Sequence, residues 1–87
     1  MKVEFKESFK RDIKKIKERQ IKDAVLSLIS TIEKSSKPQD IPHIVKTHCN
    51  NNFRIKIGSY RIGVVFEENM VILVRCLHRK DFYRFFP

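Results

Sequence analysis

Residues 53–84 read FRIKIGSYRIGVVFEENMVILVRCLHRKDFYR, and this stretch decides the fold. Apolar and polar residues alternate along it, which is typical of strands that bury one face. Gly58-Ser59 separates two alternating runs, and a glycine in the first central position favours a two-residue type II′ turn. Such a turn pairs Lys56 with Arg61 across the strands. The sequence therefore predicts a β-hairpin in this region.

The predicted hairpin has one apolar and one cationic face, because directly opposed residues share a face. Arg54, Lys56 and Arg61 lie on the cationic face, where Gly63 leaves open space opposite Arg54. Like charges opposite one another are unfavourable, so an anion or a partner's carboxylates would offset them. The alternative is a plain solvated face, because charged residues normally lie outside. The apolar face would carry Phe53, Ile55, Ile57, Tyr60, Ile62, Val64 and Phe66.

A second turn at residues 68–69 leads into a third predicted strand over residues 70–78. A strict two-residue turn would point Arg75 toward the core and place Cys76 and His78 on the cationic face. Arg75 would then be poorly placed. A β-bulge would correct this, but the sequence does not locate one.

The first half of the chain predicts a strand at residues 2–6 and two helices with a break near Arg19. Ser8 is the expected N-cap of the first helix, which would begin at Phe9. Residues 35–42 have the composition of a loop. The expected fold is an α+β domain spanning residues 1–87, in the order β-α-α-β-β-β. Two helices would pack on one face of a largely antiparallel four-stranded sheet and leave the cationic face open.

The composition is strongly basic, with 19 Lys and Arg against 10 Asp and Glu and a net charge of +9. This exceeds the charge of about 2–8 that is usual for a small soluble domain. It indicates a polyanionic partner such as nucleic acid, a membrane surface or an acidic protein. The apolar runs are too short to span a membrane, and the N-terminus lacks a signal-peptide core. We therefore expect a cytoplasmic protein with no membrane partner.

Cysteine and histidine spacing gives little support for a metal site. Cys49 and Cys76 do not make a disulfide framework, and no pair of ligands has the C-x-x-C spacing of structural zinc sites. His43, His48 and His78 could in principle join the cysteines. Cys76 is more simply a small buried apolar residue. We expect no metal or other cofactor.

Two motifs resemble the RelE/ParE superfamily of small toxins from type II toxin–antitoxin pairs, and most of all its RelE branch. They are RIKIGSYRIG at residues 54–63 and LHRKDFYRFFP at residues 77–87. The resemblance covers nearly the whole chain in element order. It departs at Phe53, where Tyr is common, and at Ser59, where Asp is common. It implies an mRNA interferase that cleaves mRNA on the ribosome, arrests translation and is silenced by a cognate antitoxin.

The resemblance also implies which residues act. It matches functional basic and aromatic positions to Arg54, Lys56, Arg61, Arg79 and Tyr83, and His78 stands where related toxins can use a histidine. Metal-independent cleavage needs the ribose 2′-OH to attack the adjacent phosphate, and fixed cations stabilise the charge that develops. Arginine can grip two phosphate oxygens at once.

Individual roles follow from this chemistry. Arg79 would stabilise the scissile phosphate or the leaving oxygen. His78 is a candidate proton carrier because the unperturbed pKa of a histidine side chain lies near neutrality, and Lys56 is another because cationic neighbours favour a neutral lysine. Tyr83 would stack on a base or orient the nucleotide. The remaining predicted RNA-binding residues are Arg75, Lys80 and Arg84.

Each role has a structural alternative. The sheet cations could bind only antitoxin carboxylates, His78 could be a hydrogen-bonded structural residue, and Tyr83 could pack on the core. Two other functions also remain open. One is a non-catalytic ParE-like toxin that poisons DNA gyrase, and the other is a basic RNA-binding module.

Overall fold

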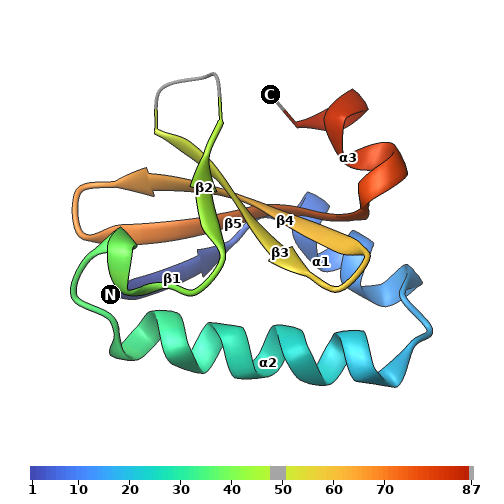
Figure 1. Ribbon diagram of the computed structural model, residues 1–87, viewed down its shortest axis with the longest axis horizontal. Helices are drawn as coiled ribbons and strands as arrows, with labels where there is room; N and C mark the ends of the chain where they lie inside the picture. Colours follow the sequence, from blue (N-terminus) through green and yellow to red (C-terminus); the bar gives the residue numbers. More distant parts are fainter. Residues whose placement is uncertain (48–50, 87) are drawn as a thin grey trace.

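A mixed sheet organises the computed structural model, which describes residues 1–47 and 51–86 (Figure 1). Within these residues the sheet has five strands in the order β1-β5-β4-β3-β2. β1 runs parallel to β5, and the other neighbours are antiparallel. The strands are β1 (Lys2–Phe5), β2 (Ile44–Lys46), β3 (Asn52–Ile57), β4 (Tyr60–Glu67) and β5 (Met70–His78). The predicted α+β class is confirmed, although the expectation of four strands missed β2.

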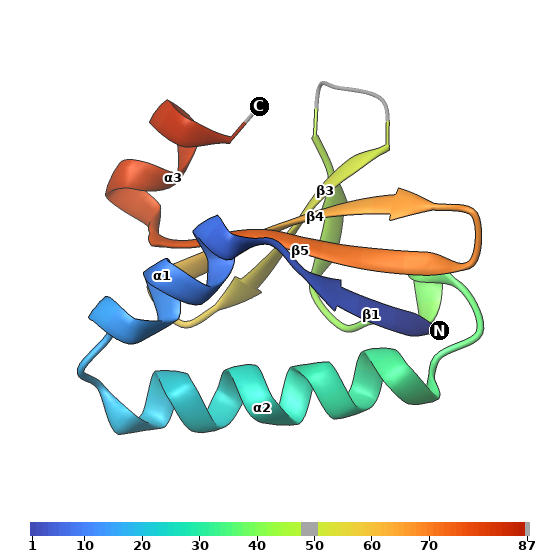
Figure 2. The ribbon, with the colours of Figure 1, turned by 180° about the vertical axis from the view of Figure 1, so that it is seen from behind.

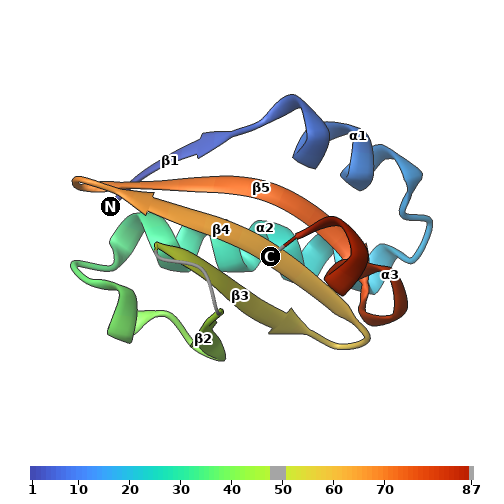
Figure 3. The same cartoon turned by 90° about the horizontal axis from the view of Figure 1, so that it is seen from above.

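The helices lie on both sides of this sheet. α1 (Glu7–Lys15) runs beside β5, and α2 (Arg19–Lys34) lies beneath the sheet (Figure 2). α3 (Arg79–Phe85) lies on the side opposite α2, as Figure 3 shows. The predicted break near Arg19 is confirmed. The expectation that the cationic face stays uncovered is wrong, because α3 packs over part of it. The predicted loop at residues 35–42 contains a short 3-10 helix, η1 (Pro38–Asp40).

The first hairpin has the register that its turn predicts. Arg54 pairs with Gly63, Lys56 with Arg61 and Ile57 with Tyr60. Gly58 has a φ of 54°, as the first central position of a type II′ turn requires. All seven residues expected on the apolar face belong to the core cluster or pack against it.

β5 contains the bulge that the sequence could not locate. Gly63 pairs with Arg75 but Val64 pairs with Leu73, so Val74 is the extra residue. A one-residue shift moves every following side chain to the other face. Cys76 consequently pairs with Ile62 and is buried in the core. The expectations that Arg75 faces the core and that Cys76 and His78 face the cations are therefore wrong.

α1 covers the part of β5 that extends beyond β1. The Ser8 hydroxyl donates to the carbonyl oxygen of Val74 at 2.6 Å, and the Asp12 carboxylate accepts from the Cys76 amide at 2.9 Å. These side chains satisfy backbone groups that a neighbouring strand would otherwise pair. The prediction that Ser8 caps the helix is wrong, because α1 begins at Glu7 with Lys6 as its N-cap.

The main core fills the space between the sheet and helices α1 and α2. Ile32, Ile62 and Val71 are fully buried there. A smaller apolar cluster lies on the other side of the sheet, where Phe82 and Phe86 of the α3 region are 0% and 5% exposed. Their ring centres are 5.3 Å apart. Among the residues described, no helix combines the length and the apolar character needed to cross a membrane.

Candidate functional site

One cross-strand row of residues supports α3. Arg54 of β3, Gly63 of β4 and Arg75 of β5 are direct neighbours in the sheet. A Cβ atom on Gly63 would lie 2.7 Å from the ring of Phe86, which no ordinary packing allows. Gly63 is therefore required for the close approach of the C-terminal segment to the sheet.

Arg54 and Tyr83 meet on one side of this row. The guanidinium carbon of Arg54 lies 5.5 Å from the centre of the Tyr83 ring, within the range of a cation–π contact. Tyr83 also packs edge-on against Phe82 but is 61% exposed. This exposure argues against Tyr83 as a core residue and leaves its ring open to a ligand. Phe82 and Phe86 supply the buried apolar contacts instead.

Lys56 and Arg61 lie toward the tip of the same hairpin. Lys56 is exposed, whereas the Arg61 side chain folds back and donates to the carbonyl oxygens of Gly58 and Tyr60 at 3.0 and 2.9 Å. Both bonds use one terminal nitrogen of Arg61, so its other donors stay available. The turn thus fixes the guanidinium beside Lys56.

The start of α3 docks on the same turn. The Arg79 amide donates to the carbonyl oxygen of Ser59 at 2.8 Å. Arg79, Lys80 and Arg84 are exposed along α3. The first residue of α3 is therefore held against the turn of the hairpin.

No carboxylate of the described residues forms an ion pair with the cations of the hairpin. Within residues 1–47 and 51–86 the ion pairs are Lys10–Glu7 and Arg75–Asp12. Arg54, Lys56 and Arg61 take part in neither. Because like charges repel, an anionic ligand would stabilise this arrangement.

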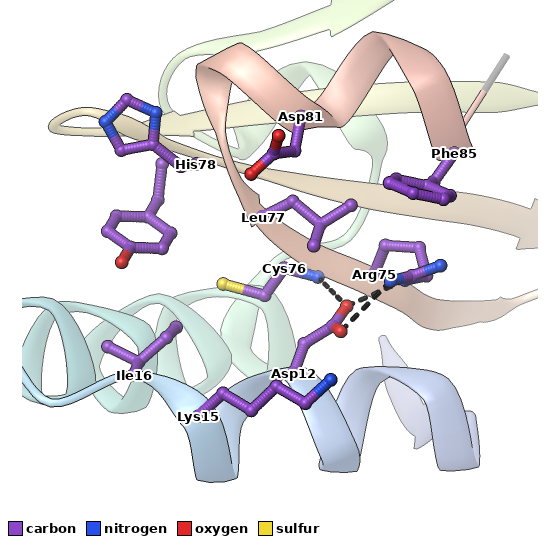
Figure 4. Close-up of a pocket in the computed structure, with 10 residues that line it drawn as sticks. Asp12, Lys15, Ile16, Arg75, Cys76, Leu77, His78, Asp81 and Phe85 are labelled. Carbon is purple, nitrogen blue, oxygen red and sulfur yellow. Dashed lines mark hydrogen bonds and ion pairs between the residues drawn. The ribbon is translucent and has the colours of Figure 1, made fainter.

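His78 does not lie on the face of the sheet that carries Arg54, Lys56 and Arg61. It pairs with Tyr60, and the two rings make an edge contact with centres 5.6 Å apart. Alternation along β4 places Tyr60 and Arg61 on opposite faces. His78 lines a pocket of about 340 Å³ between α1, β5 and α3, with Ile16, Tyr60 and Asp81 among the other lining residues (Figure 4).

His78 has a structural partner as well. Its Nδ1 accepts a hydrogen bond from the Lys80 amide at 3.2 Å and so caps α3. An acceptor nitrogen carries a lone pair, so a neutral His78 holds its proton on Nε2. This contact supports the structural alternative for His78.

Arg75 is engaged within the protein. Its Nε and Nη2 donate to the two oxygens of Asp12 at 2.7 and 3.1 Å, and its guanidinium carbon lies 5.2 Å from the Phe85 ring centre. The hydrogen bond to Asp12 raises the pKa of the Arg75 guanidinium. Arg75 is therefore not a free cation for RNA, in contrast to the expectation from the sequence.

Sequence reasoning missed Asp12, which is only 5% exposed. A signal was present, because Asp12 follows Phe9 by three residues and precedes Ile16 by four, within the apolar stripe of its helix. Of the possible metal ligands, His48 and Cys49 lie outside the described residues. Burial raises the pKa of the Cys76 thiol to about 12, which keeps it protonated. No group of three potential ligands occurs in the described part of the chain.

Comparison with known sequences identifies the family. Residues 3–83 match the sequence model for the ParE toxin of type II toxin–antitoxin systems. The chain belongs to this toxin family. It is also 33% identical over 89 residues to Toxin RelE3 of Methanocaldococcus jannaschii, with both chains fully covered. The resemblance of the two motifs to the RelE/ParE superfamily is thus confirmed.

Solved structures agree with this assignment. The RelB–RelE antitoxin–toxin complex from Methanococcus jannaschii contains a chain with a TM-score of 0.84 and 30% identity, covering 98% of this chain and 100% of that one. The toxin–antitoxin complex RelBE2 from Mycobacterium tuberculosis matches with a TM-score of 0.60 and 17% identity over 90% and 96% of the two chains. At that identity the second likeness shows the fold alone.

Proposed function

We propose that this toxin is a metal-independent endoribonuclease that cleaves mRNA on the ribosome and that a cognate antitoxin neutralises it. The observation that carries the proposal is the set of uncompensated cations on one sheet face, Arg54, Lys56 and Arg61, with the open ring of Tyr83 over Arg54. Phosphate and nucleobase are the two chemical groups that such a surface suits.

The proposed reaction is attack of a ribose 2′-OH on the adjacent phosphorus. The P–O5′ bond breaks and the leaving 5′-oxygen takes up a proton from water, which leaves a 2′,3′-cyclic phosphate and a 5′-hydroxyl. Arg54 and Arg61 stabilise the extra negative charge of the phosphorane, and Arg79 stabilises the leaving 5′-oxygen. Tyr83 stacks on a base and orients the nucleotide, and Lys80 and Arg84 attract the RNA backbone.

Lys56 is the favoured proton carrier. It shares the face of Arg54 and Arg61, whereas His78 faces α1 and its Nδ1 is occupied by the Lys80 amide. We therefore propose that Lys56 accepts the proton of the attacking 2′-OH. The role that we propose for His78 is to cap the N-terminus of α3.

The decisive experiment measures mRNA cleavage on programmed ribosomes with purified protein. Arg54→Ala, Lys56→Ala and Arg61→Ala should each lower the rate by about a hundredfold or more, as loss of one charge-stabilising donor does. Arg11→Ala in α1 is the matched control, because it removes the same charge from an exposed position away from the hairpin. Equal cleavage by all variants would refute the assignment.

His78→Ala separates the two candidate proton carriers. If Lys56 carries the proton, His78→Ala should lower the cleavage rate less than Lys56→Ala does, and only through the weaker hold on the start of α3. A loss with His78→Ala as large as that with Lys56→Ala would contradict our choice.

A gyrase poison is the second candidate, and the match to the ParE toxin model favours it. A poison that acts through protein contact needs no nuclease chemistry. Growth arrest with unbroken mRNA and gyrase-dependent DNA damage would support this function. A stable protein that causes no arrest would instead indicate a plain RNA-binding module.

The antitoxin is expected to place an acidic segment over the cationic face. The toxin chain of the Methanococcus jannaschii complex, which is similar to this one, occurs with an antitoxin. Charge pairing predicts that the affinity falls as salt rises. An affinity that does not change between low and high salt would argue against this contact surface.

A further inference from the structure

The two arginines that flank Gly63 share this glycine as a neighbour in the sheet but have different side-chain partners. Arg54 and Arg75 lie on either side of this glycine, and each lies against an aromatic ring of α3. Arg75 is paired with Asp12, whereas Arg54 has no carboxylate partner among the residues described. A single acidic residue thus distinguishes an arginine whose charge is paired from one whose charge is unpaired among the residues described.

Asp12 is well suited to hold Arg75. It reaches from α1 to the edge of β5 and accepts three hydrogen bonds, two from Arg75 and one from the Cys76 amide (Figure 4). Because Asp12 is buried, its carboxylate cannot exchange these partners for water without a large cost. The position of the Arg75 guanidinium is therefore fixed by α1.

Arg75 in turn contacts the outer part of α3. Phe85 is 56% exposed, so burial does little to fix its ring, and the Arg75 guanidinium at 5.2 Å is its cation–π partner. On the other side of the row Tyr83 lies over Arg54, and Phe86 presses on Gly63 between them. α3 is thus held at three points along one row of the sheet.

We propose that Asp12 is a positioning residue for the RNA site, because through Arg75 and Phe85 it holds α3 in the place that sets Tyr83 over Arg54. This inference rests on the proposed nuclease function. Asp12 lies on the far side of β5 from the hairpin cations and does not touch RNA. Its contribution is the orientation of the Tyr83 ring relative to the phosphate-binding arginine.

The test compares Asp12→Asn with Asp23→Asn, a matched change at an exposed position of α2. Asparagine keeps the shape and an acceptor for the Cys76 amide but loses the charge that holds Arg75. Hydrogen exchange at the Phe86 amide, which donates to the Phe82 carbonyl, reports on α3. We expect faster exchange there in Asp12→Asn and no change in α2.

Ribosome-dependent cleavage supplies the functional readout. Asp12→Asn should lower kcat by about ten- to a hundredfold, the scale for a displaced orienting group, with a smaller change in KM. Phe85→Ala should give the same loss, and because its side chain is exposed this variant is expected to fold. If Asp12 acts through Phe85, the double variant should be no worse than either single variant.

The outcomes separate the two proposals. Unchanged exchange at Phe86, or losses that multiply in the double variant, would overturn the positioning role. Faster exchange with unaltered cleavage would also overturn it, because α3 would then move without consequence for the RNA site. If wild-type protein cleaves no mRNA, the proposed function fails, and faster exchange in both Asp12→Asn and Phe85→Ala would still support the hold on α3.

Discussion

Replacing Gly63 with alanine tests how the C-terminal segment docks on the sheet. The added Cβ would lie 2.7 Å from two carbons of the Phe86 ring, although carbon atoms pack best at about 3.5–4.0 Å. The ring must therefore retreat by about 1 Å. Gly63 does not have a positive φ, so the backbone adds no strain of its own.

The expected cost follows from the burial of Phe86. Overpacking a filled site costs about 1–3 kcal/mol. Complete release of the ring would cost about 3 kcal/mol, the value for exposing a buried Phe side chain, which sets an upper limit. We expect Gly63→Ala to lower the free energy of unfolding by about 2 kcal/mol and to weaken the contact between Tyr83 and Arg54.

A double-mutant cycle measures this steric coupling by urea unfolding. In a Phe86→Ala background the clash is absent, so Gly63→Ala should cost less than about 0.5 kcal/mol. Gly58→Ala is a useful control, because its cost comes from a φ of 54°, its Cβ would meet Ile21 only at an ordinary 3.5 Å, and this cost should not depend on Phe86. An equal cost for Gly63→Ala in both backgrounds would refute the reasoning.

Two further predictions concern β5. Ser8→Ala removes the donor to the Val74 carbonyl and should cost about 1 kcal/mol in urea unfolding; an unchanged stability would show that water replaces the hydroxyl. Burial raises the pKa of the Cys76 thiol from 9.0 to about 12. The folded protein therefore binds this proton more tightly than the unfolded chain, and the free energy of unfolding should fall between pH 9 and 12, by up to about 1.4 kcal/mol per unit. Cys76→Ala should remove this part of the pH dependence, and an unaltered dependence would contradict the assignment. In a Cys49→Ser background, the native protein should react with a thiol reagent only as it unfolds.

Local patterns in the sequence were sufficient for the first hairpin. The register of Lys56 with Arg61 follows from one glycine turn and strict alternation, both of which involve neighbouring residues. The same patterns predicted the break before Arg19 and the clustering of three cations on one face. The two C-terminal motifs also carried the family resemblance that the comparisons confirmed.

Contacts between distant residues decided the rest of the site. The bulge at Val74 determines whether Arg75, Cys76 and His78 face the core, and it is accompanied by a bond from Ser8, 66 residues earlier in the chain. No pattern within β5 marks it, because alternation alone fits either register.

By itself, the sequence determined the α+β class, the hairpin and its cationic face, because periodicity and turn chemistry act over a few residues. Only the tertiary structure decided that α3 covers part of this face, that His78 lies away from it and that Asp12 pairs with Arg75. The physical reason is that these features depend on contacts between residues far apart in the sequence. Phe86 fills the space above Gly63, and Arg75 pairs with the charge of Asp12, only after folding brings them together.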